Sequence, residues 1–180
     1  MPSRTLFPML IIFGGLPGTG KTSIARELAR QIAAVFLRID SIEHAIRESG
    51  RAREPLDDAG YRIAYAVAED NLRVGHTVIS DCVNPWAITR DAYLAVAKRA
   101  QVPAVEVEIT CSDPAEHQRR VENREPDIAG FELPSWPDVV SRDYHDWQSE
   151  HIVIDTAGQS IEQSVSHLRK ALSEKLSLPW

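Results

Sequence analysis

The feature that most constrains the fold of this chain is a glycine-rich run near its N-terminus. The run reads Gly15-Leu16-Pro17-Gly18-Thr19-Gly20-Lys21-Thr22 and satisfies the phosphate-binding pattern G-x-x-x-x-G-K-[ST] without deviation. An apolar segment, residues 9–13, leads into it, and residues 21–33 follow with helical periodicity. A glycine loop between a buried strand and a helix turns backbone N–H groups toward a phosphate, and the helix dipole adds to the attraction. The run therefore predicts a P-loop.

We expect this loop to bind the phosphates of ATP together with Mg²⁺. The backbone of the run and of Ser23 would surround the phosphate oxygens, Lys21 would bridge the β and γ phosphates, and the Thr22 hydroxyl would coordinate the metal ion. From average residue frequencies, the pattern occurs by chance in roughly one chain of this length in two hundred. An accidental glycine turn beside a surface lysine is therefore a poor alternative.

Short apolar runs alternate with longer amphipathic stretches, which is the arrangement that produces a parallel sheet covered by helices. The expected strands are residues 9–13, 34–39, 77–80, 105–109 and 152–154, and the expected helices are residues 21–33, 41–48, 57–74, 86–100, 114–124 and 161–176. Asp113-Pro114-Ala115-Glu116 and Ser135-Trp136-Pro137-Asp138 are capping signals for helix starts. For 180 residues, we expect one α/β domain over residues 1–180.

The composition disfavours several other classes of protein. Twenty Lys and Arg residues against 26 Asp and Glu give a formal net charge of -6, so we expect no broad basic surface and no nucleic-acid partner. Residues 9–13 are too few to span a membrane, and we expect a cytoplasmic protein without a membrane partner. Cys82 and Cys111 have neither metal-binding nor redox spacing and are expected to be reduced thiols. The oligomeric state stays open.

Two stretches break the helical pattern and are expected to be loops beside an active site. Residues 50–60 are charged and contain Pro55, while residues 125–137 contain Pro126, Gly130, Pro134 and Pro137. We refer to residues 125–137 as the lid segment, because phosphate transfer in water needs a cover that closes over the reacting groups.

Two carboxylates at predicted strand ends are candidates for acceptor chemistry. Ligands of open α/β sheets gather at the carboxyl ends of the strands, where Asp40 and Asp81 are expected. Asp40 is our candidate base for an acceptor hydroxyl, although Asp40-Ser41-Ile42-Glu43 also resembles a helix capping box. Asp81 would hold the water shell of Mg²⁺ or a substrate hydroxyl. Asn84 would either cap the next helix or contact the substrate.

Three arginines gather where the fifth predicted helix runs into the lid segment: Arg119, Arg120 and Arg124. Arg120 and Arg124 are spaced i,i+4, so on one helix face they would repel each other unless an anion lay between them. We expect both to contact the ATP phosphates when the lid closes. The alternative is a salt-bridged surface in which Glu116 supports Arg120.

Two other classes of P-loop protein are disfavoured. Residues 155–159, Asp-Thr-Ala-Gly-Gln, resemble the switch motif of small GTPases, but they follow the last predicted strand, and no N-K-x-D guanine-reading segment occurs. Mechanical ATPases place a glutamate directly after the strand-end aspartate, whereas Asp81 is followed by Cys82. A transfer enzyme fits the carboxylates and arginines better than a hydrolase does.

With these residues, the chain resembles the small P-loop kinases that include chloramphenicol phosphotransferase, gluconate and adenylylsulfate kinases, and the zeta-toxin kinases. Asp40-Ser41-Ile42 is similar to the segment that supplies the base in the phosphotransferase, and Ile79-Ser80-Asp81 is similar to its third strand end. The resemblance implies a three-layer sandwich, a parallel sheet in the order 2-3-1-4-5 and a Mg-ATP phosphotransferase. It also implies that the loop with Ala157 and Gly158 lies beside the adenine ring.

Three functions remain open. The first is a kinase that phosphorylates a hydroxyl of a small molecule such as an antibiotic, a sugar or a nucleoside. The second is a nucleotide or nucleotide-sugar kinase, toxin-like in the latter case, whose extra basic groups for acceptor phosphates would be Arg47, Arg51, Arg53 and Arg62. The third is a module that binds ATP and transfers nothing.

Overall fold

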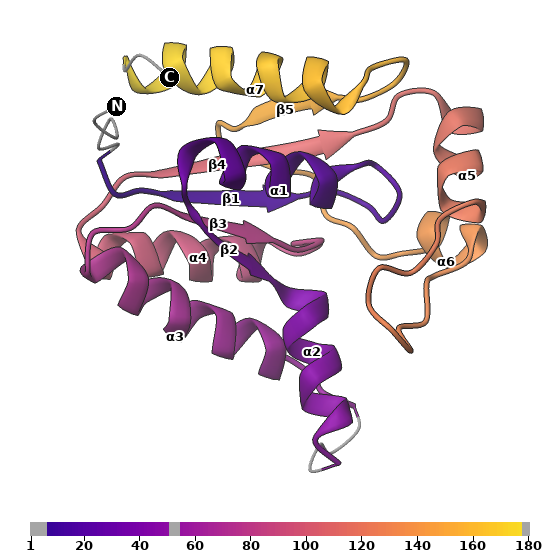
Figure 1. The fold of residues 1–180 in the computed structure, drawn as a ribbon, viewed down its shortest axis with the longest axis horizontal. Helices are drawn as coiled ribbons and strands as arrows, with labels where there is room; N and C mark the ends of the chain where they lie inside the picture. Colours follow the sequence, from indigo (N-terminus) through magenta and orange to yellow (C-terminus); the bar gives the residue numbers. More distant parts are fainter. Residues whose placement is uncertain (1–6, 51–54, 178–180) are drawn as a thin grey trace.

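The structure is a computed structural model, and it describes residues 7–50 and 55–177. Within them the strands are β1 (Leu10–Gly14), β2 (Val35–Arg38), β3 (Val78–Asp81), β4 (Ala104–Thr110) and β5 (Ile152–Asp155). The helices are α1 (Lys21–Ile32), α2 (Ile39–Glu48), α3 (Ala59–Arg73), α4 (Ala87–Ala100), α5 (Pro114–Glu122), α6 (Trp136–Val140) and α7 (Ile161–Leu176). All five strands form one parallel sheet in the order β2-β3-β1-β4-β5 (Figure 1). The predicted strand order is therefore confirmed.

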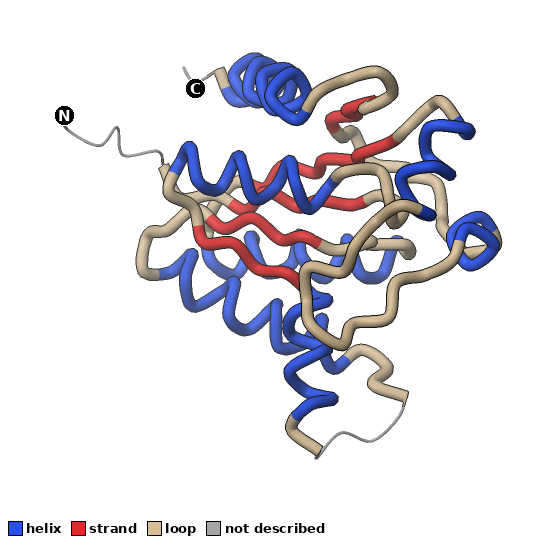
Figure 2. Tube along the Cα trace, turned by 45° about the vertical axis from the view of Figure 1, so that its right-hand side comes forward, coloured by secondary structure: helices blue, strands red, loops and turns tan. Residues whose placement is uncertain are grey.

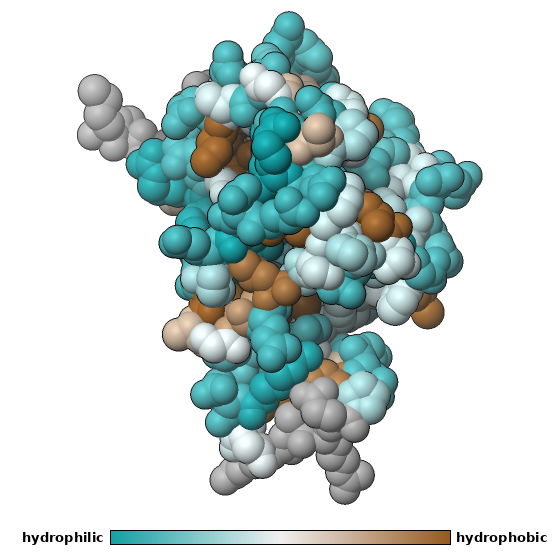
Figure 3. Space-filling model, turned by 90° about the vertical axis from the view of Figure 1, so that its right-hand side faces the viewer, coloured by the Kyte–Doolittle hydropathy of each residue, from teal (hydrophilic) through white to brown (hydrophobic). Residues whose placement is uncertain are grey.

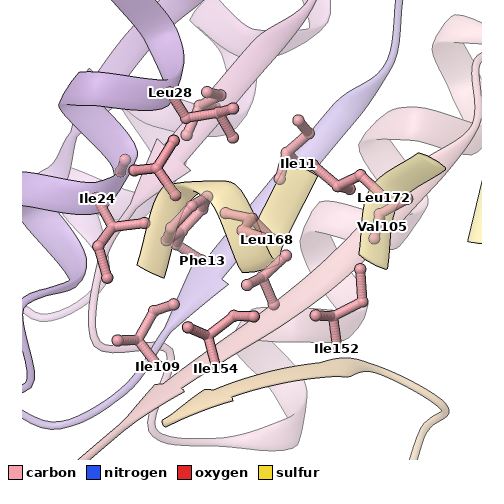
Figure 4. Close-up of a cluster of buried hydrophobic side chains, with 14 of the residues drawn as sticks. Ile11, Phe13, Ile24, Leu28, Val105, Ile109, Ile152, Ile154, Leu168 and Leu172 are labelled. Carbon is pink, nitrogen blue, oxygen red and sulfur yellow. The ribbon is translucent and has the colours of Figure 1, made fainter. Parts of the chain in front are cut away.

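Helices cover both faces of the sheet (Figure 2). Successive residues of a strand point to opposite faces, so β1 contributes to two hydrophobic cores. Ile11 and Phe13 pack with residues of α1 and α7 (Figure 4), whereas Leu10 and Ile12 pack with residues of α3 and α4. Every residue of β1 is buried, and the P-loop therefore extends from the central, fully enclosed strand.

The parallel register brings the carboxyl ends of the strands to one edge of the sheet. β1 lies between β3 and β4, with Leu10 opposite both Val78 and Ala104. In the neighbouring pair of strands, Arg38 at the end of β2 lies opposite Asp81 at the end of β3. The end of β1, where the P-loop begins, and two oppositely charged side chains thus meet at this edge.

Several boundaries differ from the prediction. β2 ends at Arg38 and α2 begins at Ile39, because Ile39 is buried in the core between the sheet and α3 instead of extending the edge strand. α5 ends at Glu122, before Arg124, and Asn123 closes the helix. The expected caps are confirmed: Asp113 accepts hydrogen bonds at the start of α5, and Ser135 forms a capping box with Asp138 at the start of α6.

The two predicted loops follow α2 and α5 in the sequence. Of residues 50–60, the part 51–54 lies outside the described residues, and α3 begins at Ala59. The lid segment is irregular up to Ser135, and its last two residues open α6. In the described part of the chain, every helix is too short or too polar to cross a membrane.

Candidate active site

The P-loop leaves β1 at Gly14 and enters α1 at Lys21, as predicted. Gly15 and Gly18 have φ values of 134° and 85°, which glycine adopts at little steric cost. A Cβ on Gly15 would lie 2.2 Å from the carbonyl oxygen of Ile109, and one on Gly18 would lie 2.4 Å from Cγ2 of Val121. The loop is therefore held closely against β4 and α5.

Contacts within and behind the loop fix its shape. The Thr19 hydroxyl donates to the carbonyl of Leu16 at 2.9 Å. The carbonyl of Pro17 lies 2.8 Å from Nε2 of His117 in α5, and the His117 ring packs edge-to-face on Trp136 at 5.1 Å between centroids. His117 is thus a structural residue that connects the P-loop to α5 and α6.

A cavity of about 880 Å³ opens beside the P-loop, which is within the size range of small-molecule binding pockets. Its walls come from the P-loop with the start of α1, from α5 with the residues after it, and from the connection between β5 and α7. The lining includes Gly18, Gly20, Lys21, Thr22, Ser23, Arg119, Arg120, Arg124, Thr156, Gln159 and Ser160. The structure thus brings the predicted arginines to the P-loop, and this cavity is the candidate nucleotide site.

Lys21 and Asp81 interact electrostatically beneath the loop. Lys21 is 8% exposed, and the Asp81 side chain is 1% exposed. Burial lowers the pKa of Lys21, while the carboxylates of Asp81 and Asp40 act in the opposite direction. Burial raises the pKa of Asp81, opposed first by the Lys21 ammonium. The P-loop lysine is therefore close to both carboxylates that the sequence singles out.

The surroundings of Asp81 suit a Mg²⁺ ion. Both of its carboxylate oxygens are buried and have no hydrogen-bond partner of normal geometry among the described residues, whereas buried polar oxygens usually have one. The neighbouring Thr22 hydroxyl acts to lower the pKa of Asp81. No cluster of three or more His, Cys, Asp or Glu side chains in the described ranges is arranged to hold a metal by itself. Carboxylate and hydroxyl oxygens, such as those of Asp81 and Thr22, are the kind of ligand that Mg²⁺ takes in proteins.

Asp40 lies in the first turn of α2, not at the end of a strand. The prediction of a capping box there is wrong, because the N-cap is Arg38 and no side chain caps the helix. The Asp40 side chain is 34% exposed, and its Oδ2 lies 3.5 Å from Nη2 of Arg38. A partly exposed carboxylate near the P-loop lysine is compatible with the predicted contact to an acceptor hydroxyl.

Asn84 does not cap a helix, since α4 begins at Ala87 with Trp86 as its N-cap. Its side chain is fully buried, and Nδ2 donates to the carbonyl of Phe13 at 2.7 Å. The residue adopts a positive φ of 49°. Asn84 thus supports the end of β1 from inside the protein. A contact with substrate stays a prediction, although the side chain has no exposed surface here.

Arg120 and Arg124 do not share a helix face, because α5 ends between them. Arg120 forms the expected ion pair with Glu116 and also donates to the hydroxyl and the carbonyl of Thr156. Arg124 lies close enough to lower the pKa of Lys21. The two arginines therefore occupy different environments: Arg120 is held in a hydrogen-bond network, and Arg124 lies by the phosphate end of the cavity.

The connection after β5 reaches the cavity through Thr156 and Gln159, while Ala157 and Gly158 lie beside these lining residues. The Gly158 N–H donates to Oε2 of Glu116 at 2.9 Å, and the Ala157 N–H donates to Oδ1 of Asp155 at 3.1 Å. The turn is thus anchored to α5 and to its own strand. Its place at the cavity is compatible with the predicted position beside the adenine ring.

Three charged residues of this region were not among the predicted site residues: Arg26, Arg38 and Asp127. Asp127 of the lid segment accepts hydrogen bonds from Arg38 at 2.8 Å and 3.0 Å and from Arg26 at 2.7 Å. A charged residue near the end of an apolar run, Arg38, was a signal available in the sequence. No sequence pattern places Asp127 beside it, because 89 residues separate them.

Comparison with known proteins supports the architecture. The family model described as an AAA domain matches residues 10–135. No curated protein matches the chain.

Solved kinases share the fold. The APS kinase CysC of Mycobacterium tuberculosis, in complex with AMPPNP and APS, aligns with a TM-score of 0.70 and 20% identity over 93% of this chain and 98% of that one. A sugar kinase from Janibacter sp. HTCC2649 aligns with a TM-score of 0.67 and 18% identity over 93% of this chain and 95% of that one. A gluconokinase from Sinorhizobium meliloti 1021 aligns with a TM-score of 0.62 and 20% identity over 95% of this chain and 97% of that one. The expected resemblance to small P-loop kinases is confirmed for the fold.

Proposed function

This chain belongs to the AAA domain family, and from that premise we propose that it is a kinase that transfers the γ-phosphate of Mg-ATP to a hydroxyl group of a small molecule. One observation carries the proposal: the Arg38 guanidinium lies 3.5 Å from Asp40 and 4.0 Å from the buried Asp81, and both carboxylates counteract the lowering of the Lys21 pKa by burial. A P-loop by itself serves phosphate binding. A partly exposed carboxylate beside its lysine supplies the additional group that transfer to a hydroxyl requires.

In this proposal the nucleotide occupies the cavity beside the P-loop. The loop N–H groups and Lys21 bind the β and γ phosphates, and Arg124 offsets the negative charge that develops during transfer. Thr22 and Asp81 hold Mg²⁺, directly or through water. The ion, when bound, neutralises phosphate charge and keeps the phosphates in line with the acceptor. Asp40 orients the acceptor hydroxyl and takes its proton.

The charges near Asp40 bear on the acceptor class. One solved APS kinase is in complex with AMPPNP and APS, and a phosphorylated acceptor would need basic groups near Asp40. In the present chain Arg47 is paired with Glu43 at 3.9 Å, and Arg51 and Arg53 lie outside the described residues. Arg62 is exposed on α3. We propose an acceptor such as an antibiotic, a sugar or a nucleoside, and the transfer assay distinguishes it from a nucleotide or a nucleotide sugar.

The test is a transfer assay with γ-labelled ATP, Mg²⁺ and a panel of hydroxylated antibiotics, sugars, nucleosides and nucleotide sugars. The Asp40→Asn and Lys21→Ala variants serve as matched controls. Label on one acceptor class, lost in both variants, supports the proposal and the role of Asp40. Labelling of nucleotide sugars alone would favour the toxin-like kinase. Intact ATP binding without label on any acceptor would favour an ATP-binding module.

A further inference from the structure

The Asp127 carboxylate joins the lid segment to the side of the molecule that bears Asp40, which we call the acceptor side. The lid segment runs from the end of α5 toward α2 (Figure 2), where the Phe131 ring contacts the His44 ring at 6.5 Å between centroids. Asp127, near its start, accepts two hydrogen bonds from the Arg38 guanidinium, at Oδ2 from Nη1 and at Oδ1 from Nη2. This is the bidentate geometry that gives arginine and carboxylate pairs their strength and fixed orientation.

Arg38 is surrounded by carboxylates from three elements. Its side chain is 5% exposed. Besides the two bonds to Asp127, Nη2 lies 3.5 Å from Oδ2 of Asp40, and Nε lies 4.0 Å from Oδ2 of Asp81. An arginine retains its charge when buried, so its orientation follows its best partners. The two short bonds to Asp127 therefore set the plane of the guanidinium, and the longer contacts to Asp40 and Asp81 follow from it.

We propose that Asp127 is a positioning residue for the acceptor side of the site: by holding the Arg38 guanidinium, it sets the position of Asp40. Docking of the lid segment and placement of the candidate base are then one event. When the lid segment undocks, Arg38 loses its two hydrogen bonds to Asp127. The Arg38 guanidinium is then no longer held in place beside Asp40 at the start of α2. Closure of the lid segment over the nucleotide is thereby coupled to the correct position of Asp40.

Arg26 distinguishes this proposal from simple anchoring of the lid segment. Its Nη2 donates to the same Oδ2 atom of Asp127 at 2.7 Å, but the Arg26 side chain comes from α1 and is 55% exposed. Among the described residues, Arg38 is the side chain whose ion pairs join Asp127 to Asp40. If Asp127 served only to anchor the lid segment, loss of Arg26 and loss of Asp127 would both loosen the lid segment, and neither would affect α2. Figure 3 shows mostly hydrophilic side chains, with scattered hydrophobic patches, on the face bearing α5, α6 and the lid segment.

Hydrogen–deuterium exchange of the whole protein without ligands tests the coupling directly. We compare the parent with Asp127→Asn, Asp127→Glu and the control Arg26→Gln, after thermal melts establish that each is folded. Asp127→Asn should speed exchange about tenfold both in the lid segment and in peptides of α2, because a charge-assisted bidentate pair is lost. Arg26→Gln should speed exchange in the lid segment alone, and Asp127→Glu should restore part of the protection in α2. Unchanged exchange of α2 in Asp127→Asn, or equal effects of Arg26→Gln on α2, would overturn the proposal.

A kinetic measurement adds a second readout, and this part rests on the proposed function. With an acceptor identified by the transfer assay, and at saturating ATP, Asp127→Asn should raise the acceptor KM or lower kcat, and Arg26→Gln should change both parameters less than Asp127→Asn does. Both residues line the nucleotide cavity, so a change in ATP affinity common to both variants is expected and is not diagnostic. If the parent transfers no phosphate, the proposed function fails, whereas the exchange experiment still decides the role of Asp127.

Discussion

Arg120 donates one hydrogen bond to the Thr156 hydroxyl at 2.8 Å and another to the Thr156 carbonyl at 2.9 Å. The same hydroxyl lies 2.9 Å from the carbonyl of Thr19 in the P-loop. α5, the connection after β5 and the P-loop are thus joined through two side chains. Arg120 has a structural task at the nucleotide cavity in addition to the phosphate contact that its sequence position suggests.

This relationship predicts that Arg120→Gln weakens Mg-ATP binding about tenfold, the usual effect of losing hydrogen bonds from a charged donor. Thr156→Val keeps the shape of the side chain but removes the hydroxyl. Because both substitutions break the contact between Arg120 and the Thr156 hydroxyl, the double variant should lose less affinity than the sum of the two single losses. Calorimetric titration of the three variants measures the coupling. Additive losses would show that the two residues act independently.

The tight packing behind the P-loop predicts a large effect of Gly18→Ala. At Gly18, φ is 85°, and a Cβ would lie 2.4 Å from Val121. Gly75 is a matched control, because its φ is 95° and a Cβ there would have no neighbour within 4 Å. Gly75→Ala should cost about 1 kcal/mol from backbone strain alone. Gly18→Ala should cost about 1–3 kcal/mol more, from overpacking against α5. Urea unfolding measures both, and equal costs would contradict tight packing at Gly18.

Lys21→Ala should reduce the affinity for Mg-ATP by at least about tenfold, since a buried ammonium that meets the phosphates is removed. Asp40→Asn should leave this affinity within about twofold, because Asp40 is not among the described residues that line the nucleotide cavity. Titration with a non-hydrolysable ATP analogue provides the comparison. If Lys21→Ala bound the ATP analogue with the parent affinity, the assignment of this cavity as the nucleotide site would be refuted.

The hydrogen bonds from Arg38 and Arg26 hold the pKa of Asp127 well below its ordinary value of 3.8. A carboxyl whose pKa is depressed by folding stabilises the protein fully above its unfolded pKa, and this contribution is lost as the pH falls through the folded pKa. The difference in unfolding free energy between the parent and Asp127→Asn should therefore be constant from about pH 5 to 8 and should shrink below about pH 4. Denaturant unfolding across this range measures it. A difference in unfolding free energy that grows toward low pH would contradict stabilisation by the ion pairs of Asp127.

The elements of the fold were predictable because their signals are local. The P-loop pattern fixes one strand-to-helix junction, and the apolar runs identify the remaining strands. The sheet order came from the resemblance to small P-loop kinases. The start of α2 was misplaced because Arg38 and Ile39 read as a continuation of the strand. In the structure, burial of Ile39 against α3 turns the chain into a helix at that point.

The candidate site was predictable only in part. Residues fixed by a motif or by a strand end, such as Lys21, Thr22 and Asp81, lie together as expected. Asn84 has the polar side chain expected of a cap, but its positive φ and its bond to Phe13 direct it inward. The contact of Asp127 with Arg38 depends on the path of an irregular loop, for which no periodicity exists. Long-range ion pairs of this kind follow from the three-dimensional structure alone.

The most direct test of the proposed function is a single-turnover reaction with γ-labelled ATP and excess enzyme, in which the label is partitioned between an organic acceptor and inorganic phosphate. With the acceptor found by the panel, we predict that nearly all label appears on the acceptor in the parent protein. In Asp40→Asn, we predict that the label stays on bound ATP. Label released only as inorganic phosphate, or transfer by Asp40→Asn at the parent rate, would contradict the assignment of a kinase with Asp40 at its acceptor side.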